Sequence, residues 1–596
     1  MTHAFATRRG DLLAVAGAET GKILAEGDVE VSEAIDFAAW YVDRAEELEG
    51  VDGAQFVPPR VTVVTPPWNF ALSITAGSTL AALAAGSSVL LKPAPQARHC
   101  AAVISECLWE AGIPRDVLQL VDVEENEAGK HLVSHPEVDR VILTGAWETA
   151  KLFRSWRHDL PVLAETSGKN SIIVTENADY DLAAADIIKS AFGNAGQKCS
   201  AASLIILVGQ AYRSQRLRHQ ILDAASSIRV GSPSDLRSQM GPLAEPASGK
   251  LLDGLTKLDP GQEWALEPVR IDEEGRYWSP GVRSGIKPGD PYHLTEYFGP
   301  ITGIMYAPDL ATAIAYQNGT AFGLTAGLHS LDPAEIEFWA ERANAGNLYV
   351  NRSITGAIVG RQPFGGWKRS AVGPGAKAGG YHYLQVLGTW RRAEVSAPTP
   401  ADRPCALVEQ FVGHIEGLVT RDERAWLLDA VARDAREWDE WFGRSIDVGG
   451  LEKERNILRY RPASTQVRGC ADAKLVDVAR VVAAGLLAAG DNISVCLDPS
   501  LGEGLGRALR SVGVAVTTAS DEDWYASLGA SRVRLVGGNP SRAADEADGD
   551  PDLALWANEV TSAPQVELLP FLREQSVSMT AHRFGNPDAG VLSVRL

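Results

Sequence analysis

Cysteine is scarce in this sequence, and long apolar runs are missing from it. Only 6 of the 596 residues are cysteine and no Cys-x-x-Cys pair occurs, which argues against a disulfide framework and a zinc site. No apolar stretch approaches the roughly 20 residues that cross a bilayer. The first residues, MTHAFATRRGDLLAVAG, lack the apolar core of a secretory signal. The sequence therefore predicts a cytoplasmic protein with no membrane span and no bound metal.

Basic residues are in the minority. The 56 Lys and Arg face 76 Asp and Glu, which gives a formal net charge of −20. A nucleic-acid partner is not expected, because phosphate binding requires clustered basic residues. The hydrophobic fraction of 45% is typical of globular proteins, and 596 residues are too many for one ordinary core. We expect two or more domains.

Short aliphatic runs alternate with longer helical stretches over the first part of the chain. The stretch 71–86 is rich in Ala and Leu and predicts a helix. Alternation of strands and helices predicts a parallel sheet covered on both faces, a Rossmann-like nucleotide-binding architecture. The runs that predict its strands lie at 61–66, 88–91, 117–122, 140–145 and 161–165.

The rest of the chain divides into further α/β regions. The segment SAPTPADRP at 396–404 is rich in Pro and Ala and predicts an interdomain linker. Beyond it, helices are predicted over 405–445 and at 477–490, the latter before a strand in NISVCLDP. The predicted division is a nucleotide-binding domain at 1–167, a catalytic domain with a returning segment at 168–395, the linker, and a C-terminal domain at 405–596.

Cys199, in the stretch FGNAGQKCSAAS, has two possible roles. A free Cys is usually a small packing residue, and only its reactivity makes it special. Packing is our interpretation of the other five cysteines, since no ligand spacing accompanies them. For Cys199 the choice depends on the surrounding motifs.

Four separated motifs accompany Cys199. They are TPPWNFALS with Asn69, AETSGKN with Glu165, TEYFGP with Glu296 and Phe298, and RQPFGGWKRS at 361–370. In this order they resemble the aldehyde dehydrogenase superfamily, from about Arg8 to Trp390. The resemblance implies an α/β aldehyde dehydrogenase fold, made of a Rossmann-like NAD-binding domain and an α/β catalytic domain.

The resemblance assigns chemical roles to three of these residues. It makes Cys199 the nucleophile whose thiolate attacks an aldehyde carbon, giving a thiohemiacetal that becomes a thioester. It places the Asn69 amide and the N–H of Cys199 in the oxyanion hole. It makes Glu165 the general base that activates water to hydrolyse the thioester. The alternative for Glu165 is a solvated carboxylate at a strand end.

The resemblance also implies NAD as the cofactor. Lys92 would bond the adenosine ribose, Glu296 the nicotinamide ribose, and Phe298 would lie beside the nicotinamide ring. The turn TGAWETA would present a helix N-terminus to the pyrophosphate. Pro95 stands where many NAD-preferring relatives carry an acid, so NADP remains an alternative. The cofactor-binding residues predicted in this way are Thr65, Pro66, Trp68, Lys92, Gly145, Ala146, Glu296 and Phe298.

The substrate prediction depends on QKCSA and on residues 361–384. These stretches resemble glutamate-semialdehyde (pyrroline-5-carboxylate) dehydrogenases, which bind the α-carboxylate of the substrate. Carried over, the contacts are Ser200, Gly379 and Gly380, since successive glycine N–H groups can form an anion nest. A flexible turn is the alternative for KAGG. Phe192 and Phe364 are candidate contacts for the aliphatic part of the substrate, although aromatics at such places are as often core.

The last 190 or so residues resemble another known region. LEKERNILRYRP at 451–462 and ELLPFLREQSVSMTAHRFG at 567–585 are similar to the C-terminal part of long proline utilization A proteins. This implies an additional, non-catalytic Rossmann-like domain that covers a substrate channel and supports assembly. It also implies a proline dehydrogenase module or partner and a homo-oligomer. The chain begins inside the first domain of the family, so an N-terminally truncated chain is expected.

Three functions remain open from the sequence. The leading one is NAD-dependent oxidation of L-glutamate γ-semialdehyde to L-glutamate in proline catabolism. The second is oxidation of another small acid-bearing aldehyde. The third is a non-catalytic assembly or channelling module that keeps the fold without the activity.

Overall fold

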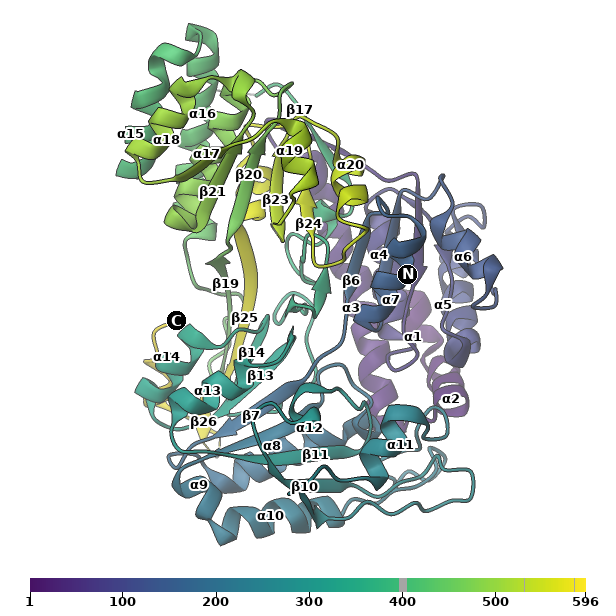
Figure 1. Cartoon of the computed structure of the whole chain (residues 1–596). Coiled ribbons are helices and arrows are strands. Elements are labelled where there is room, and N and C mark those ends of the chain that lie inside the picture. Colours follow the sequence, from purple (N-terminus) through teal and green to yellow (C-terminus); the bar gives the residue numbers. More distant parts are fainter. Residues whose placement is uncertain (396–404, 530, 584) are drawn as a thin grey trace.

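Three large sheets, three two-stranded ladders and the helices around them make up the computed structural model, which describes residues 1–395, 405–529, 531–583 and 585–596. The predicted linker at 396–404 lies outside the described residues. Figure 1 shows the C-terminal sheet (β20–β24) at one end of the molecule and the largest sheet at the other. The first sheet and the N-terminal helices lie along one side.

The N-terminal helices pack against the first sheet. They are α1 (Thr2–Thr7), α2 (Arg9–Thr20) and α3 (Leu24–Glu49), and α3 contacts α4 (Ser73–Ala84). Glu30 of α3 is buried and accepts hydrogen bonds from the backbone N–H groups of Leu72 and Ser73, at 2.9 and 3.4 Å. A carboxylate at this end of α4 complements the helix dipole. Lys22 lies 2.5 Å from the other oxygen of Glu30 and balances its buried charge.

The first sheet has the predicted strands. Read across the sheet, the order is β16-β6-β5-β2-β3-β4. The strands are β2 (Val61–Thr65), β3 (Ser88–Leu91), β4 (Leu118–Leu120), β5 (Arg140–Thr144), β6 (Val162–Glu165) and the short antiparallel β16 (Ala371–Val372). Its other helices are α5 (Arg98–Glu110), α6 (Glu127–Ser134) and α7 (Trp147–Trp156). From β2 to β6 the pairing is parallel, which confirms the predicted Rossmann-like architecture.

A second, ten-stranded sheet carries the largest share of the strands. Its order is β18-β19-β25-β14-β13-β7-β8-β11-β10-β9. The strands are β7 (Asn170–Val174), β8 (Ala202–Val208), β9 (Glu263–Leu266), β10 (Gly281–Ile286), β11 (Ile301–Ala307), β13 (Thr325–His329), β14 (Asn347–Val350), β18 (Ile446–Asp447), β19 (Glu454–Pro462) and β25 (Leu572–Thr580). The accompanying helices are α8 (Tyr180–Phe192), α9 (Gln210–Arg213), α10 (Gln215–Ser226), α11 (Gly249–Thr256), α12 (Pro291–Leu294), α13 (Leu310–Asn318) and α14 (Pro333–Arg342).

The C-terminal region forms a parallel sheet of its own. Its order is β22-β21-β20-β23-β24, with strands β20 (Thr465–Gly469), β21 (Ile493–Leu497), β22 (Ala515–Thr518), β23 (Arg532–Val536) and β24 (Ala554–Trp556). Its helices are α15 (Ala406–Ile415), α16 (Arg421–Glu437), α17 (Leu475–Ala489), α18 (Glu503–Ser511), α19 (Asp521–Ala526), α20 (Pro540–Glu546) and α21 (Pro564–Glu567). The predicted C-terminal Rossmann-like arrangement is confirmed.

The C-terminal region also completes the second sheet. Strand β25 pairs in parallel with β14, with Leu348 opposite Val577, and β19 pairs antiparallel with β25. Residues on both sides of the predicted linker therefore share one sheet and one hydrophobic core. The division of the chain into domains stays a prediction, because one sheet draws its strands from both sides of the proposed boundary.

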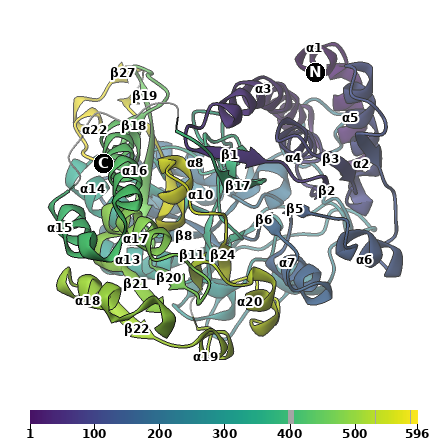
Figure 2. The same cartoon turned by 90° about the horizontal axis from the view of Figure 1, so that it is seen from above.

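Small two-stranded ladders complete the fold. They are β1 (Ala54–Val57) with β17 (Thr389–Arg392), β12 (Phe322–Gly323) with β15 (Trp367–Lys368), and β26 (His582–Arg583) with β27 (Asn586–Pro587), followed by α22 (Ala589–Leu592). Figure 2, which views the molecule from above, shows β24 and α20 beside β6 and α7.

The described helices are all too short or too polar to cross a membrane. Packing is confirmed for Cys100, Cys107, Cys470 and Cys496, which are buried, but it is wrong for Cys405, which is exposed. The described part of the chain also holds no group of three His, Cys, Asp or Glu side chains arranged to bind a metal ion.

Candidate active site

The predicted cofactor residues gather at the carboxyl ends of the strands of the first sheet. Thr65 ends β2, Lys92 directly follows β3, and Gly145 directly follows β5. Strands β2 and β5 are neighbours, and the strand order runs outwards from them in opposite directions. This is the topological switch point of the sheet, where α/β proteins bind ligands in a crevice at the strand ends. Ala146 is the N-cap of α7, whose first N–H groups face this edge.

Space and donors in this crevice suit a dinucleotide. A methyl group added to Gly145 would approach only the Leu143 side chain, at 3.4 Å, so a ligand can lie against the backbone there. The ring of Trp68 meets that of Phe298 edge to face, with centroids 5.6 Å apart, and Phe298 holds a left-handed φ of 59°. The Lys92 ammonium is 3.1 Å from Glu125.

Glu296 is fixed at the edge of the crevice. One of its carboxylate oxygens accepts a hydrogen bond from the Gly168 N–H at 3.0 Å, and burial raises its pKa. Lys169 lies close enough to interact with this carboxylate, and burial lowers the pKa of that lysine to about 7. The side chain is thus held in place before any ligand is bound.

The loop that carries Cys199 is set by an unusual turn after α8. Asn194 and Ala195 adopt left-handed φ angles of 53° and 54° inside the turn at 193–196. Asn170 then anchors the loop, because its Nδ2 donates to the carbonyls of Cys199 and Ala201 at 2.7 and 3.1 Å. Non-glycine residues rarely hold such angles, and they do so mostly where the surrounding structure imposes them.

Cys199 and Glu165 face one cavity. Ser200 also lines it, as do the side chains of Phe364 and Tyr383. The cavity therefore brings together a thiol, a carboxylate and aromatic walls, as a site for a small substrate with an apolar chain requires.

The thiol of Cys199 is protonated at rest. Burial raises its pKa to about 12, and the charges of Glu165 and Glu296 act in the same direction. The backbone N–H groups of Ser200 and Cys199 itself bond the sulfur and act in the opposite direction. A nucleophile in this state needs a base nearby to become a thiolate.

Glu165 has the properties of such a base. Burial raises its pKa to about 8, while the charge of Lys377 and the N–H of Ala378 act to lower it. Its Oε1 is buried without a hydrogen-bond partner among the described residues. A base of this pKa accepts a proton at neutral pH and releases it readily. The solvated-carboxylate alternative for Glu165 does not fit this burial.

Asn69 lies next to the nucleophile loop but does not line the cavity. Its Nδ2 donates to the carbonyl of Gln197 at 3.2 Å, and its own carbonyl accepts from Lys22 at 2.8 Å. The buried Lys22–Glu30 pair therefore positions Asn69 beside the cysteine loop. The oxyanion-hole role of Asn69 stays a prediction.

The structure does not bring Gly379, Gly380 or Phe192 to the cavity. The N–H of Gly379 donates to the Tyr41 hydroxyl at 3.0 Å, and that of Gly380 donates to the Lys377 carbonyl at 3.0 Å. Both amides of the expected anion nest are thus engaged within the protein. Phe192 is 1% exposed and packs in the core, where it does not reach the cavity.

The Gly379 loop is instead tied to the C-terminal region. Glu574 of β25 accepts a hydrogen bond from the backbone N–H of Lys377 at 3.1 Å. The other oxygen of this buried carboxylate accepts from the Tyr460 hydroxyl of β19 at 3.3 Å. Strands from beyond residue 405 therefore hold a loop close to Glu165.

The cavity is lined by Gly356 and Ala357, and not by Gly379 and Gly380, which the sequence predicted as substrate contacts. Gly356 has a left-handed φ of 91°, and a methyl group added to it would meet nothing within 4 Å. Neither backbone N–H has a hydrogen-bond partner among the described residues. The sequence offered one sign that this loop contributes to the site: Gly356 stands shortly before Phe364, which was already a candidate substrate contact.

Charged residues of α3 also line the cavity, although the sequence did not indicate them as site residues. Burial raises the pKa of Glu33 to about 7. Lys198, the neighbour of the nucleophile, is paired with Glu26 at 2.5 Å. These carboxylates follow a helical spacing along α3, which sequence patterns typically present as an exposed charged face.

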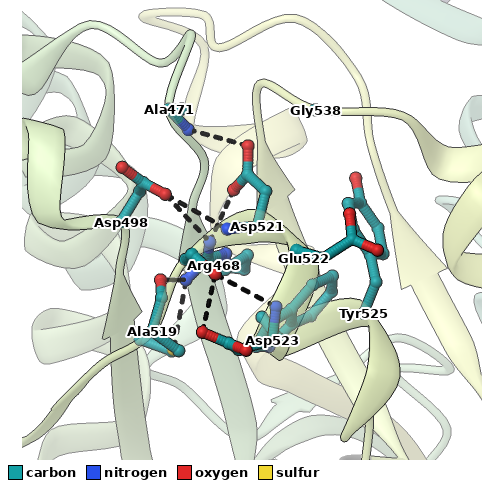
Figure 3. Close-up of polar contacts among 12 residues, drawn as sticks. Arg468, Ala471, Asp498, Ala519, Asp521, Glu522, Asp523, Tyr525 and Gly538 are labelled. Carbon is teal, nitrogen blue, oxygen red and sulfur yellow. Dashed lines mark hydrogen bonds and ion pairs between the residues drawn. The ribbon is translucent and has the colours of Figure 1, made fainter.

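The C-terminal sheet has a corresponding crevice, and its own side chains fill it (Figure 3). Arg468 is buried at the end of β20 and donates to Asp521 at 2.5 Å and to the Ala519 carbonyl at 3.0 Å. Asp521 accepts the N–H of Ala471, and Asp498 accepts the N–H of Asp521, both at 3.1 Å. Carboxylates thus take loop N–H groups that would otherwise be free to face an anionic ligand.

The model of the aldehyde dehydrogenase family matches residues 1–389. The chain belongs to the aldehyde dehydrogenase family. It is 35% identical over 398 residues to the 1-pyrroline-5-carboxylate dehydrogenase of Geobacillus sp. (strain WCH70), which covers 63% of this chain and 76% of that protein. The predicted fold and the resemblance to pyrroline-5-carboxylate dehydrogenases are confirmed.

Solved structures extend this aldehyde dehydrogenase likeness. The proline utilization A (PutA) structure from Corynebacterium freiburgense is 42% identical with a TM-score of 0.85, and the match covers 98% of this chain and 56% of the other. A 1-pyrroline-5-carboxylate dehydrogenase from Thermus with bound NAD is 32% identical with a TM-score of 0.61, over 66% of this chain and 79% of the other. This chain therefore spans little more than half the length of the PutA chain it matches.

Proposed function

We propose that this aldehyde dehydrogenase oxidises L-glutamate γ-semialdehyde, formed from pyrroline-5-carboxylate, to L-glutamate with NAD in proline catabolism. The observation that carries the proposal is that the Cys199 thiol and the Glu165 carboxylate line one cavity beside a Rossmann crevice. Relatives named as 1-pyrroline-5-carboxylate dehydrogenases, from Geobacillus sp. (strain WCH70) and Bacillus subtilis (strain 168), support the choice of substrate.

Catalysis begins with the protonated thiol. Glu165, whose pKa is raised to about 8 by burial, receives a proton as Cys199 attacks the aldehyde carbon. The N–H groups of Cys199 and Ser200 already face the sulfur, and we assign the oxyanion to the Cys199 N–H together with the amide of Asn69. Before hydrolysis, Glu165 releases the proton of the Cys199 thiol to solvent. As a carboxylate it then takes a proton from the water that attacks the thioester, and the departing thiolate takes that proton back, which releases the acid and restores the thiol.

NAD, when bound, supplies the hydride acceptor. We assign its binding to residues at the strand ends, with Lys92 and Glu296 toward the two riboses and the α7 N-terminus, after Gly145 and Ala146, toward the pyrophosphate. We assign the walls of the same crevice to Thr65, Pro66, Trp68 and Phe298, since Thr65 ends β2 and the rings of Trp68 and Phe298 are in contact.

Substrate polarity matches the charged lining of the cavity. We assign the α-carboxylate to the free N–H groups of Gly356 and Ala357, with Ser200 beside them, and the α-ammonium to Glu33. Phe364 covers the aliphatic chain. These contacts would favour the semialdehyde over aldehydes without an α-amino acid group.

NADH formation from pyrroline-5-carboxylate tests the function. We expect turnover by the unmodified chain, loss of at least about 10³-fold in Cys199→Ala, and much weaker turnover of butanal, which lacks the α-amine and α-carboxylate. Absence of NADH from a folded, NAD-binding chain would exclude the catalytic proposal and leave the assembly module. Equal turnover of butanal would favour another aldehyde as substrate.

The proposal also covers the partners of the protein and its location in the cell. Similarity to PutA, including a bifunctional PutA protein with 32% identity, supports a proline dehydrogenase module or partner and a homo-oligomer. All six cysteines are free, which supports the reducing cytoplasm as the location. Size-exclusion chromatography with light scattering, with and without a proline dehydrogenase, tests the assembly.

A further inference from the structure

A cavity of about 540 Å³ lies between the first sheet and the C-terminal region. Arg140, at the start of β5, lines it, whereas Thr144, at the other end of the same strand, lines the Cys199 cavity. The two cavities are therefore at opposite edges of the first sheet. Figure 2 shows β24 and α20 of the C-terminal region beside β6 and α7.

Within the part of the chain that the structure describes, Arg140 is a buried cation without a hydrogen-bonded counter-charge, and Asp139 is the only carboxylate whose charge acts on it. It is 9% exposed, and its Nε is buried without a partner among the described residues. The neighbouring Asp139 is committed to Arg60, whose Nη2 lies 3.0 Å away. Burial lowers the pKa of Arg140 to about 10, so the side chain still carries its charge. An unpaired buried charge is unfavourable and calls for an anionic partner.

Two further polar groups without partners line the same cavity. Trp556, from β24, is only 8% exposed. Its indole N–H is buried and has no acceptor in the described part of the chain. The Oε1 of Gln385, from the returning segment, likewise has no donor there. Buried polar groups without partners are rare in proteins, so three around one cavity indicate a missing ligand.

The remaining charges of the lining are already used or are positive. Arg157 pairs with Asp159 at 3.1 Å, and Glu559 accepts the backbone N–H of Arg392 at 3.1 Å. Arg154 donates only to carbonyl oxygens, those of His158 and Leu553. The lining therefore has no free carboxylate to neutralise Arg140, and its field favours an anion.

We propose that this cavity binds a small organic carboxylate that also carries a hydrogen-bond donor, as an α-hydroxy or α-amino acid does. The carboxylate oxygens accept from the Arg140 guanidinium and the Trp556 indole N–H, and the hydroxyl or ammonium group donates to Gln385. The volume is ample for such a molecule with its ordered water. The ligand would join three separate segments of the chain.

Thermal unfolding and calorimetric titration with glycolate, glycine, acetate and inorganic phosphate, at constant ionic strength, test the proposal on the whole chain. We expect glycolate or glycine to raise the melting temperature and to bind at least threefold more tightly than acetate, which lacks the donor for Gln385. Phosphate binding in preference to every carboxylate would overturn the proposed ligand class. Absence of any shift beyond that caused by chloride would overturn the site.

Matched variants locate the binding. Arg140→Met removes the unpaired charge, so we expect no loss of melting temperature without ligand and at least tenfold weaker carboxylate binding. Trp556→Phe removes only the indole N–H and should weaken binding about threefold or more. The control Trp524→Phe loses a satisfied bond to Gln466 (2.9 Å), so it should lower the melting temperature and leave binding unchanged. Unchanged binding in both Arg140→Met and Trp556→Phe would place the ligand elsewhere and overturn the proposal.

Discussion

The first sheet and the C-terminal sheet share one strand order and differ in what stands at their strand ends. Each parallel series reads third, second, first, fourth, fifth in chain order, β4-β3-β2-β5-β6 in one and β22-β21-β20-β23-β24 in the other. The residue directly after the second strand is Lys92 in the first sheet and Asp498 in the C-terminal sheet. Two sheets of equal topology thus place opposite charges at the same point.

Strand order alone provides a crevice, and the loops at the strand ends decide how it is used. In the first sheet the strand ends offer a lysine, a helix N-terminus and open space at Gly145. In the C-terminal sheet Asp521 and Asp498 accept the loop N–H groups, and Arg468 balances them. The crevice of the C-terminal sheet is therefore occupied by side chains of the protein itself.

Removing Glu165 should give the largest contrast between the crevices. Glu165→Gln loses the base, so we expect steady-state NADH formation to fall by about 10²–10⁴-fold. Because Glu165 also takes the proton of the Cys199 thiol, the first turnover should be slowed as well, so rapid mixing should show no burst of NADH. Asp498→Asn, the control in the C-terminal crevice, should keep its activity. A normal steady-state rate in Glu165→Gln would remove this residue from the mechanism.

Breaking the filled crevice should affect stability and not cofactor use. Asp521→Ala removes the nearer carboxylate of the buried Arg468 and leaves only Asp498, at 3.8 Å, which we expect to lower the free energy of unfolding by about 1–3 kcal/mol. Denaturant unfolding measures the loss. The double variant Arg468→Met/Asp521→Ala should recover part of it, because the weakly paired charge is gone. If Asp521→Ala also raised the KM for NAD, the two crevices would be coupled.

Lys92 should control cofactor affinity more weakly. Lys92→Ala removes a charged donor, worth about 1.5–3 kcal/mol, so the KM for NAD is expected to rise about tenfold or more with a smaller change in kcat. The corresponding Asp498→Ala should leave the KM for NAD unchanged and lower the melting temperature instead. Equal effects of the two substitutions on the KM would contradict the assignment of NAD to the first sheet.

The strands and the catalytic pair could be predicted from the sequence because their signals are local. Aliphatic runs predicted β2 to β6 within about two residues at each end, and the motifs around Cys199 and Glu165 pointed to the cavity they share. Contacts between distant segments could not be predicted. Gly379 looked free in the sequence, but its N–H is engaged by Tyr41 of α3. Likewise, the pairing of β25 with β14 joins residues more than two hundred positions apart.

The Cys199 cavity and the C-terminal crevice should respond to pH in opposite ways. Burial raises the pKa of Glu165 to about 8 and that of Glu33 to about 7, above their ordinary value of 4.5, so the folded chain holds protons that the unfolded chain releases. Their contribution to stability is complete below pH 4.5 and is lost as the pH rises through 7 and 8. Activity should increase over the same interval, by about tenfold per pH unit below 8, because only ionised Glu165 is a base.

In the C-terminal crevice the sign is reversed. Burial acts to raise the pKa of Asp498, but hydrogen bonds from Ser500 and the charge of Arg468 prevail and lower it below 3.8. Its contribution is therefore present above pH 3.8 and is lost only as the pH falls through the lowered pKa. Unfolding measured from pH 3 to 9 should show Glu33→Gln flattening the alkaline decline and Asp498→Asn flattening the acid decline. If Glu33→Gln left the alkaline decline unchanged, a buried, protonated carboxyl in the cavity would not be its cause.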